Sequence, residues 1–360
     1  MYRSLINHKK IKYSILKELI AEYMVGVKEV NCFLSLDMIL KTFYSIKPDE
    51  VSESLASANP NALSSEIINV VAHYRHYFWS RYHVPSNYFI YYSFDMADYC
   101  CEHCLTYKES YYNKRMGNTE IQEYKIINEN IEFNLNLIKL ITEYLPNIYF
   151  INTGSLEPAV LPQLLISKNK PKETIHNFVF TTNKNEYQMV NNPYTTVISV
   201  NGDDSKVYTS HNLMYSLVKG TKDADARKEI IRKVSSKFYI PTLAISGYKS
   251  YDIKGCKGYG TVKVLKLISK LLKENKISDI DYTTLDDILQ YFPNSDIQLI
   301  NNNYYVLNLK NLVQNISNKE YINIKKQINN KSDNMSLMEI NSKYYESNPL
   351  MLIELMEGEE

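Results

Sequence analysis

Short apolar runs alternate with amphipathic segments along the first two thirds of this 360-residue chain. The runs are rich in β-branched and aromatic residues, which favour buried strands. We predict strands at residues 29–37, 88–95, 147–152, 177–182, 195–200 and 206–209. Segments with a helical repeat of apolar residues predict helices at residues 4–26, 38–45, 50–84, 120–144 and 159–166. This alternation predicts an α/β fold around a parallel or mostly parallel sheet.

The last third of the chain is predicted to be mostly helical. Helical periodicity appears at residues 211–243, in two pieces, and at residues 262–273, 284–291 and 308–327. Between them, residues 296–307 are polar and strand-like. Residues 315–347 are rich in Asn and Lys, with weak periodicity, and are predicted to be flexible. An acidic piece at residues 349–356 is predicted to be a short docking helix.

Acidic residues mark the ends of two predicted strands and the start of a predicted helix. Asp37 and Asp95 close the first two strands, and Glu157 precedes the helix at 159–166, with Ser155 as a candidate N-cap. Open α/β sheets place their chemistry at the carboxyl ends of the strands. An Asp at such a position also caps a following helix well, so both roles are open.

Residues 247–276 join a glycine-rich turn to a basic amphipathic helix. The turn contains Gly247, Gly255, Gly258 and Gly260, and residues 245–276 hold eight lysines against two acidic residues. The free N–H groups at the start of the helix would suit a phosphate. Taken alone, the stretch is explained better by a turn before a surface helix, because short glycine motifs have many false positives.

Composition limits the classes of partner. The content of 44% hydrophobic and 22% charged residues is that of a globular protein, and the net charge of +1 requires any nucleic-acid surface to be a local patch. The end of the chain, residues 334–360, is acidic. Neither a membrane-spanning run nor a signal peptide is recognisable, so we expect a soluble cytoplasmic protein without a membrane partner. Abundant Asn, Ile, Lys and Tyr suggest an AT-rich genome, such as that of a virus or phage.

Two histidine and cysteine clusters raise the question of a metal. The five cysteines are odd in number, which fits reduced thiols. Cys100, Cys101, His103 and Cys104 are spaced too tightly for a zinc site with two separate ligand pairs. The pair His73 and His76 has no acidic residue nearby, so packing explains it better.

Basic and aromatic residues interleave after the second strand. Lys108, Lys114 and Arg115 alternate with Tyr107, Tyr111 and Tyr112. This pattern offers phosphate contacts and stacking faces for a single strand, or else a solvated helix face.

In their order, these segments resemble the 5′-nuclease family of flap endonucleases and 5′–3′ exonucleases, a branch of the PIN-like nucleases. The resemblance covers roughly residues 30–275. It rests on Asp37, on Phe94-Asp95, on the segment from Tyr107-Lys108 to Arg115, on Leu156-Glu157, on residues 181–189, and on residues 247–260. The last two stretches are the most specific, and residues 247–260 correspond to the helix–three-turn–helix hairpin of the family.

The resemblance implies a PIN-like, mostly parallel central sheet flanked by helices. It implies a core at residues 1–210 with an arch-like helical insertion near residues 97–144. A helical subdomain with the hairpin would follow at residues 211–292. Residues 293–360 would be a helical C-terminal extension, partly flexible and acidic at its end.

The sequence departs from the family at the metal-binding positions. The family hydrolyses phosphodiesters with two divalent metals held by carboxylates, because hard cations prefer anionic oxygen ligands. Here Asn183, Asn185 and Tyr251 stand at carboxylate positions, as does Tyr248. The remnant set of Asp37, Asp95 and Glu157 would hold at most one Mg²⁺ or Mn²⁺ ion. Nearby acidic residues could substitute for a lost ligand, namely Asp203, Asp204 and Asp252.

The hairpin gains positive charge relative to the family, because Lys254 and Lys257 replace prolines. The resemblance implies binding of duplex DNA, and K⁺, at the hairpin. The residues expected to contact DNA there are Lys249, Lys254, Gly255, Lys257, Gly258, Gly260, Thr261 and Lys263.

Three hypotheses follow. The leading one is a catalytically degenerate, DNA-binding accessory subunit of a viral or phage DNA-processing, transcription or packaging complex. The second is an active metal-dependent 5′-nuclease with a rebuilt site. The third is a structural protein that keeps only the fold and binds a protein partner through its acidic tail.

Overall fold

The computed structural model describes part of the chain in detail, namely residues 20–36, 38–39, 62–93, 138–139, 142–168, 171–200, 205–219, 223–251, 253–278 and 285–331. The predictions at Asp37, Asp95, Lys108, Lys114 and Arg115 lie outside these residues. The same is true of the Cys100–Cys104 cluster, of Asp203, Asp204 and Asp252, and of the acidic residues 334–360.

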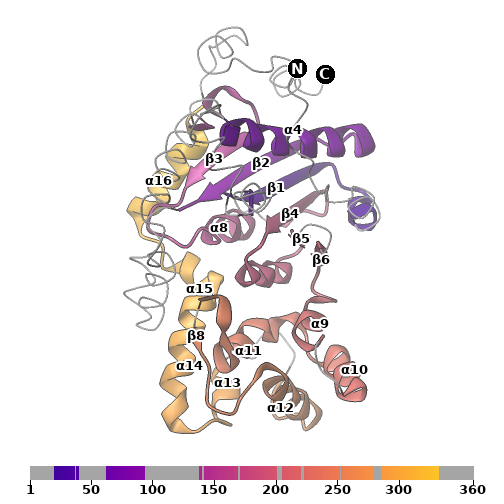
Figure 1. Ribbon diagram of the computed structural model, residues 1–360, viewed down its shortest axis with the longest axis vertical. Coiled ribbons are helices and arrows are strands. Elements are labelled where there is room, and N and C mark those ends of the chain that lie inside the picture. Colours follow the sequence, from indigo (N-terminus) through magenta and orange to yellow (C-terminus); the bar gives the residue numbers. More distant parts are fainter. Residues whose placement is uncertain are drawn as a thin grey trace.

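A six-stranded sheet forms the centre of the molecule (Figure 1). Its strands are β1 (Glu29–Ser35), β2 (Ser86–Tyr92), β3 (Ile148–Asn152), β4 (Ile175–Thr181), β5 (Thr195–Ser199) and β6 (Lys206–Tyr208). Their order is β3-β2-β1-β4-β5-β6, and every neighbouring pair is parallel except β5 and β6. The predicted α/β class with a mostly parallel sheet is confirmed.

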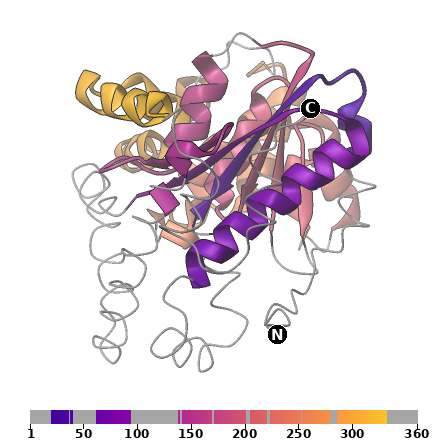
Figure 2. The ribbon, with the colours of Figure 1, turned by 90° about the horizontal axis from the view of Figure 1, so that it is seen from above.

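The two faces of the sheet are covered by different helices. Alternate residues of the strands point to opposite faces. Leu34 and Phe178 belong to the hydrophobic cluster that includes Phe78 of α4 (Ala62–Tyr82). Phe33 belongs to the other cluster, with residues of α8 (Val160–Lys168). Figure 2 shows α4 lying across its face of the sheet.

The second hydrophobic cluster continues into a helical part below the sheet in Figure 1. Its elements are α9 (Leu213–Val218), α10 (Ala224–Lys233), η3 (Ser236–Phe238), α11 (Tyr239–Ser246), β7 (Gly247–Tyr248), η4 (Lys249–Tyr251), β8 (Ile253–Lys254), α12 (Thr261–Lys273) and α13 (Leu285–Leu289). One continuous hydrophobic core therefore joins the sheet and the helical part.

The predicted strand-like piece at residues 296–307 is wrong. These residues belong to α14 (Asn294–Leu307), because Ile297, Ile300, Tyr304 and Leu307 recur at helical spacing and meet the core. The polar Asn303 is buried and donates to the carbonyls of residues 244 and 254, at 2.9 and 2.8 Å.

The predicted flexibility of residues 315–347 is also wrong for the part that the structure describes. After α15 (Leu309–Gln314), α16 (Asn318–Asn329) begins with a capping box formed by Ser317 and Glu320. Gln327 exchanges two hydrogen bonds with the main chain of Asn152, each 2.9 Å long, and so covers the open edge of β3. The polar composition of α16 serves this edge, and the helix predicted at residues 308–327 covers α15 and most of α16.

None of the helices in the described residues combines the length and the apolar character needed to cross a bilayer. The short η1 (Ala21–Met24) lies within the predicted helix at residues 4–26, most of which is outside the described part.

Candidate functional site: a polar cluster and a basic hairpin

Glu157 lies in the turn between β3 and α8, at the carboxyl end of the sheet. Its side chain is buried, with 3% of its surface exposed. The carbonyl of the same residue accepts from the N–H of Val160, at the start of α8, at 2.9 Å. The prediction of Ser155 as the N-cap is wrong, because α8 begins at Val160 and the Ser155 hydroxyl donates to Glu320 at 3.2 Å.

Two hydrogen-bond donors occupy one oxygen of the Glu157 carboxylate. The Tyr251 hydroxyl donates to Oε1 at 2.7 Å, and Asn183 Nδ2 approaches the same atom at 3.3 Å. Asn183 Nδ2 also donates to the Tyr251 hydroxyl at 2.6 Å. The three side chains form a closed triangle, which brings together three positions singled out in the sequence.

Tyr248 completes this arrangement, which we call the polar cluster: Glu157, Asn183, Tyr248 and Tyr251. The Tyr248 hydroxyl donates to Asn183 Oδ1 at 3.4 Å. The Tyr248 and Tyr251 rings meet edge to face, with centroids 4.9 Å apart and planes at 67°. The hydroxyl groups of the two rings thus reach the Glu157 carboxylate and the Asn183 amide.

The hairpin places the tyrosines at the end of the sheet. Tyr248 is the last residue of β7, which pairs with β8 in an antiparallel ribbon, and Tyr251 ends the 3₁₀ turn between them. Asn183 follows β4 and is held by its own turn, since its Oδ1 accepts from the N–H of Asn185 at 3.0 Å. Contacts between residues so far apart in the chain depend on the fold alone.

The chemistry of the polar cluster does not fit a pair of divalent cations. Mg²⁺ and Mn²⁺ require several oxygen ligands that carry or share negative charge. In the cluster, an O–H and an N–H group point at the single carboxylate, so donors stand where acceptors are needed. Within the described residues, no three His, Cys, Asp or Glu side chains are grouped to hold a metal.

Asn185 lies outside the polar cluster, although it was singled out together with Asn183. It is fully buried, and its Oδ1 accepts from Gln188 Nε2 at 3.0 Å. Gln188 also donates to the Leu307 carbonyl at 2.8 Å and accepts from the Leu309 N–H at 3.1 Å. This part of the motif at 181–189 connects the sheet to the C-terminal helices.

Sequence reasoning missed a second buried carboxylate beside the cluster. Glu186, in the 3₁₀ helix η2 (Lys184–Asn191), is 2% exposed and accepts from the Tyr91 hydroxyl at 2.5 Å. The signal was an acidic residue within a motif already noted, and its partner Tyr91 lies in the tyrosine-rich strand β2. Its burial could not be read from the sequence.

Further buried tyrosines near the cluster stay protonated. Burial raises the pKa of Tyr187, whose hydroxyl donates to Ser199 Oγ at 2.6 Å. Burial also raises the pKa of Tyr239 well above its ordinary value, and this hydroxyl donates to the Lys184 carbonyl at 3.0 Å. Both groups therefore act as neutral donors that fix η2 in place.

The four glycines of the hairpin have different roles. Gly247 has a φ of +84°, and Gly255 packs directly against the end of α11, where an added Cβ would lie 2.2 Å from the carbonyl carbon of Ser246. Gly258 also has a φ of +84°, whereas Gly260 has ordinary angles and open space around it. Two glycines therefore hold the hairpin to α11, and two shape its exposed tip.

The start of α12 is open to an approaching ligand. Gly260 caps the helix without a side-chain hydrogen bond, and its carbonyl accepts from the N–H groups of Lys263 and Val264. Helix N-termini present free N–H groups and the positive end of the dipole. Thr261, the first residue of α12, is half-buried at this end.

The lysines around the hairpin divide into paired and unpaired groups. Lys266 contacts Asp223 at 3.2 Å, and Lys270 and Lys276 contact Glu274 at 3.8 and 2.8 Å. In the part of the chain that the structure describes, no carboxylate pairs with four further exposed lysines, which are Lys249, Lys254, Lys257 and Lys263. The Lys263 ammonium lies 4.6 Å from the centroid of the Tyr259 ring. Three of these lysines lie in the hairpin, and Lys263 lies in the first turn of α12.

No protein-family model matches the chain, and no curated protein matches it by sequence. Solved structures of bacteriophage T5 proteins resemble it in fold. A 5′-exonuclease of T5 with bound zinc has a TM-score of 0.54 at 12% identity and covers 84% of this chain and 98% of its own. A T5 protein crystallised with metal ions has a TM-score of 0.55 at 11% identity, and covers 84% and 99%.

A T5 flap endonuclease in a pseudo-enzyme–product complex with DNA and metal ions also resembles the chain. Its TM-score is 0.51 at 10% identity, and the match covers 91% of this chain and 99% of that one. These likenesses show the fold, which is that of a 5′-nuclease.

Proposed function

We propose that this chain, which has the fold of a 5′-nuclease, is a DNA-binding protein whose metal-dependent cleavage site has been replaced by a hydrogen-bonded polar cluster. One observation carries the proposal: the Tyr251 hydroxyl donates to Glu157 at 2.7 Å, from a position where the resemblance implies a carboxylate. A hydroxyl there supplies a hydrogen bond to the Glu157 carboxylate but no anionic oxygen ligand for a metal. Phosphodiester hydrolysis by two metals would have no second metal site in this cluster.

The basic hairpin supports the binding half of the proposal. Unpaired lysines beside an open helix N-terminus suit the phosphates of a duplex, because each neutralised phosphate releases counterions. One of the structural neighbours is described as a complex with DNA. We place this protein as an accessory subunit of a viral or phage DNA-processing, transcription or packaging complex.

Binding is tested with a labelled duplex and a flap substrate over a series of salt concentrations. The double variant Lys254→Gln/Lys257→Gln should bind the duplex about tenfold more weakly, and the slope of log K against log salt should fall by about 1.8. The matched control is Lys270→Gln/Lys276→Gln, which removes two lysines of the same region that Glu274 already pairs. Equal effects of the two double variants, or no binding at low salt, would contradict the proposal.

An active nuclease with a rebuilt site is the second candidate. Glu157 is retained and buried, and Asp37 and Asp95 follow the two strands, β1 and β2, that lie between β3 and β4 in the sheet. Incubation of flap and gapped substrates with Mg²⁺ or Mn²⁺ decides between the candidates. We expect no cleavage; cleavage that disappears in Glu157→Gln would establish the second candidate in place of the first.

A further inference from the structure

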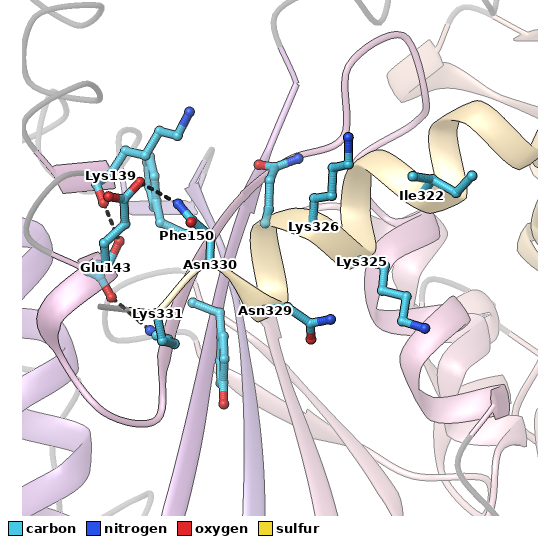
Figure 3. A pocket seen from close by; sticks show the side chains of 12 residues that line it. Lys139, Glu143, Phe150, Ile322, Lys325, Lys326, Asn329, Asn330 and Lys331 are labelled. Atoms are coloured by element: carbon cyan, nitrogen blue, oxygen red, sulfur yellow. Dashed lines mark hydrogen bonds between the residues drawn. The ribbon is translucent and has the colours of Figure 1, made fainter. Parts of the chain in front are cut away.

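A basic pocket lies at the outer edge of the sheet, between α16 and the segment that precedes β3 (Figure 3). Its volume is about 510 Å³. Among the described residues, four lysines line it and one acidic residue does, Glu143. The lysines are Lys139, Lys325, Lys326 and Lys331. We call this the edge pocket.

One face of α16 forms a wall of the edge pocket. Ile322, Lys325, Lys326 and Asn329 recur at the spacing of a single helix face, and all four are exposed. The opposite face packs on the protein through the buried Ile324. The exposed face thus combines two ammonium groups, an amide and an apolar side chain, of which Ile322 is 51% exposed.

The remaining charged groups of the edge pocket are held by protein atoms. The Lys331 ammonium donates to the carbonyls of Thr142, at 2.7 Å, and Leu145, at 2.9 Å, and to that of Ile148. Glu143, in the segment that precedes β3, accepts a hydrogen bond from Asn330 Nδ2 at 2.9 Å (Figure 3). These bonds fix the back of the pocket and connect α16 to the start of β3.

Three ammonium groups are left for a ligand. Lys139, Lys325 and Lys326 are exposed, and within the described residues no carboxylate pairs with them. Like charges gathered around a hollow repel each other, so the arrangement is relieved by an anion with several charges. An amide and an exposed apolar side chain beside the lysines suit a base and its sugar better than a free phosphate ion.

We propose that the edge pocket binds the phosphates of a single nucleic-acid strand that extends beyond the duplex held at the hairpin. The hollow of about 510 Å³ can admit part of a flexible single strand, whereas a rigid duplex is too wide to enter it. The proposal builds on the DNA-binding function proposed above.

The position of α16 supports a strand that continues along this edge. The start of α16 contacts the turn of the polar cluster, where Ser155 donates to Glu320. Its other end reaches Ile148, at the beginning of β3, through Lys331. A helix of 12 residues spans about 18 Å, and the lining of the edge pocket begins at Ile322, so the pocket lies within one helix length of the contact between Glu320 and Ser155.

The test compares two fluorescent DNA ligands, a blunt duplex and the same duplex with a poly-thymidine tail of about ten nucleotides. The variant Lys325→Gln/Lys326→Gln should bind the blunt duplex as the unchanged protein does. Its affinity for the tailed duplex should fall about tenfold, and the salt slope for that ligand should fall by about 1.4. Both lysines are exposed, so the variant should fold.

The control is Lys228→Gln/Lys319→Gln, which removes two exposed lysines outside the edge pocket and the hairpin. A loss confined to the tailed duplex and to the pocket variant supports the proposal. No loss, or an equal loss for both duplexes, overturns it. If the pocket variant instead loses affinity only for a peptide of residues 334–360, the pocket binds an acidic protein segment and the proposal is also overturned.

The two proposals fail in distinguishable ways. If the blunt duplex does not bind at all, the hairpin function fails. The tailed duplex then reports on the edge pocket alone, and the pocket proposal still stands or falls by the Lys325→Gln/Lys326→Gln comparison.

Discussion

At the scale of single residues, the polar cluster shows how hydrogen bonds support a buried carboxylate. Removal of a charged group from water is costly unless hydrogen bonds replace the lost hydration. Tyr251 and Asn183 supply such bonds to Glu157, and Asn183 is itself bound by Tyr248. Asn183 and Tyr251 carry no negative charge, so Glu157 is the single carboxylate among the four residues of this cluster.

A second buried polar residue, His176, makes the stability depend on pH. Burial lowers its pKa from 6.5 to about 4, and its Nε2 lies 2.9 Å from the Thr196 hydroxyl. Between these pH values the unfolded chain binds a proton at His176 that the folded chain does not bind. The stabilisation from the neutral imidazole is therefore complete above pH 6.5 and is lost as the pH falls toward 4.

We predict that His176→Gln reduces this acid sensitivity. In urea unfolding at pH 7 and at pH 4.5, the loss of unfolding free energy should be smaller in the variant by about 2–3 kcal/mol. His76→Gln is the control, because His76 is exposed on α4. The prediction fails if His176→Gln and the unchanged protein lose equal stability between the two pH values.

At the scale of elements, the hairpin combines two requirements in one short segment. Its base must pack against α11, which excludes a side chain at Gly255, and its tip must stay open at the start of α12. The sequence marks all four glycines alike. The structure separates them, because the space around each Cα depends on elements that the hairpin contacts.

Alanine substitutions should report this difference. Gly255→Ala would bring Cβ within 2.2–2.5 Å of backbone atoms of residues 246 and 247, so we expect a loss of about 3 kcal/mol in unfolding free energy. Gly260→Ala meets nothing within 4 Å and should lose less than about 1 kcal/mol. Thermal and urea unfolding check both, and a similar stability of the two variants would contradict the proposed packing role of Gly255.

At the scale of the whole molecule, buried amide groups connect the core with the C-terminal helices. Gln188 of η2 makes hydrogen bonds to the main chain at residues 307 and 309, in the turn between α14 and α15. Asn303 of α14 connects in the same way to α11 and β8. The C-terminal helices therefore belong to the same cooperative structure as the sheet.

The variant Gln188→Met tests this connection while nearly preserving side-chain volume. It would leave a buried N–H and a buried carbonyl unsatisfied, so we expect the unfolding free energy to fall by about 2–4 kcal/mol. Gln290→Met is the control, because its amide only contacts the Asp287 carbonyl at an exposed site, and it should change stability by less than about 0.5 kcal/mol. Equal urea midpoints for the two variants would refute the connection.

The sequence by itself determined the strands, the fold class and the basic glycine hairpin, because these follow from local periodicity and composition. It misjudged α14, since the polar Asn303 of this helix meets buried main-chain groups of other elements. It predicted most of α16, which begins within the helix expected at residues 308–327. Only the tertiary structure decided that Asn183 and Tyr251 surround Glu157 while Asn185 does not. Adjacent residues of one motif can face different neighbours, and hydrogen bonds between residues far apart in the chain exist only once the fold brings their elements together.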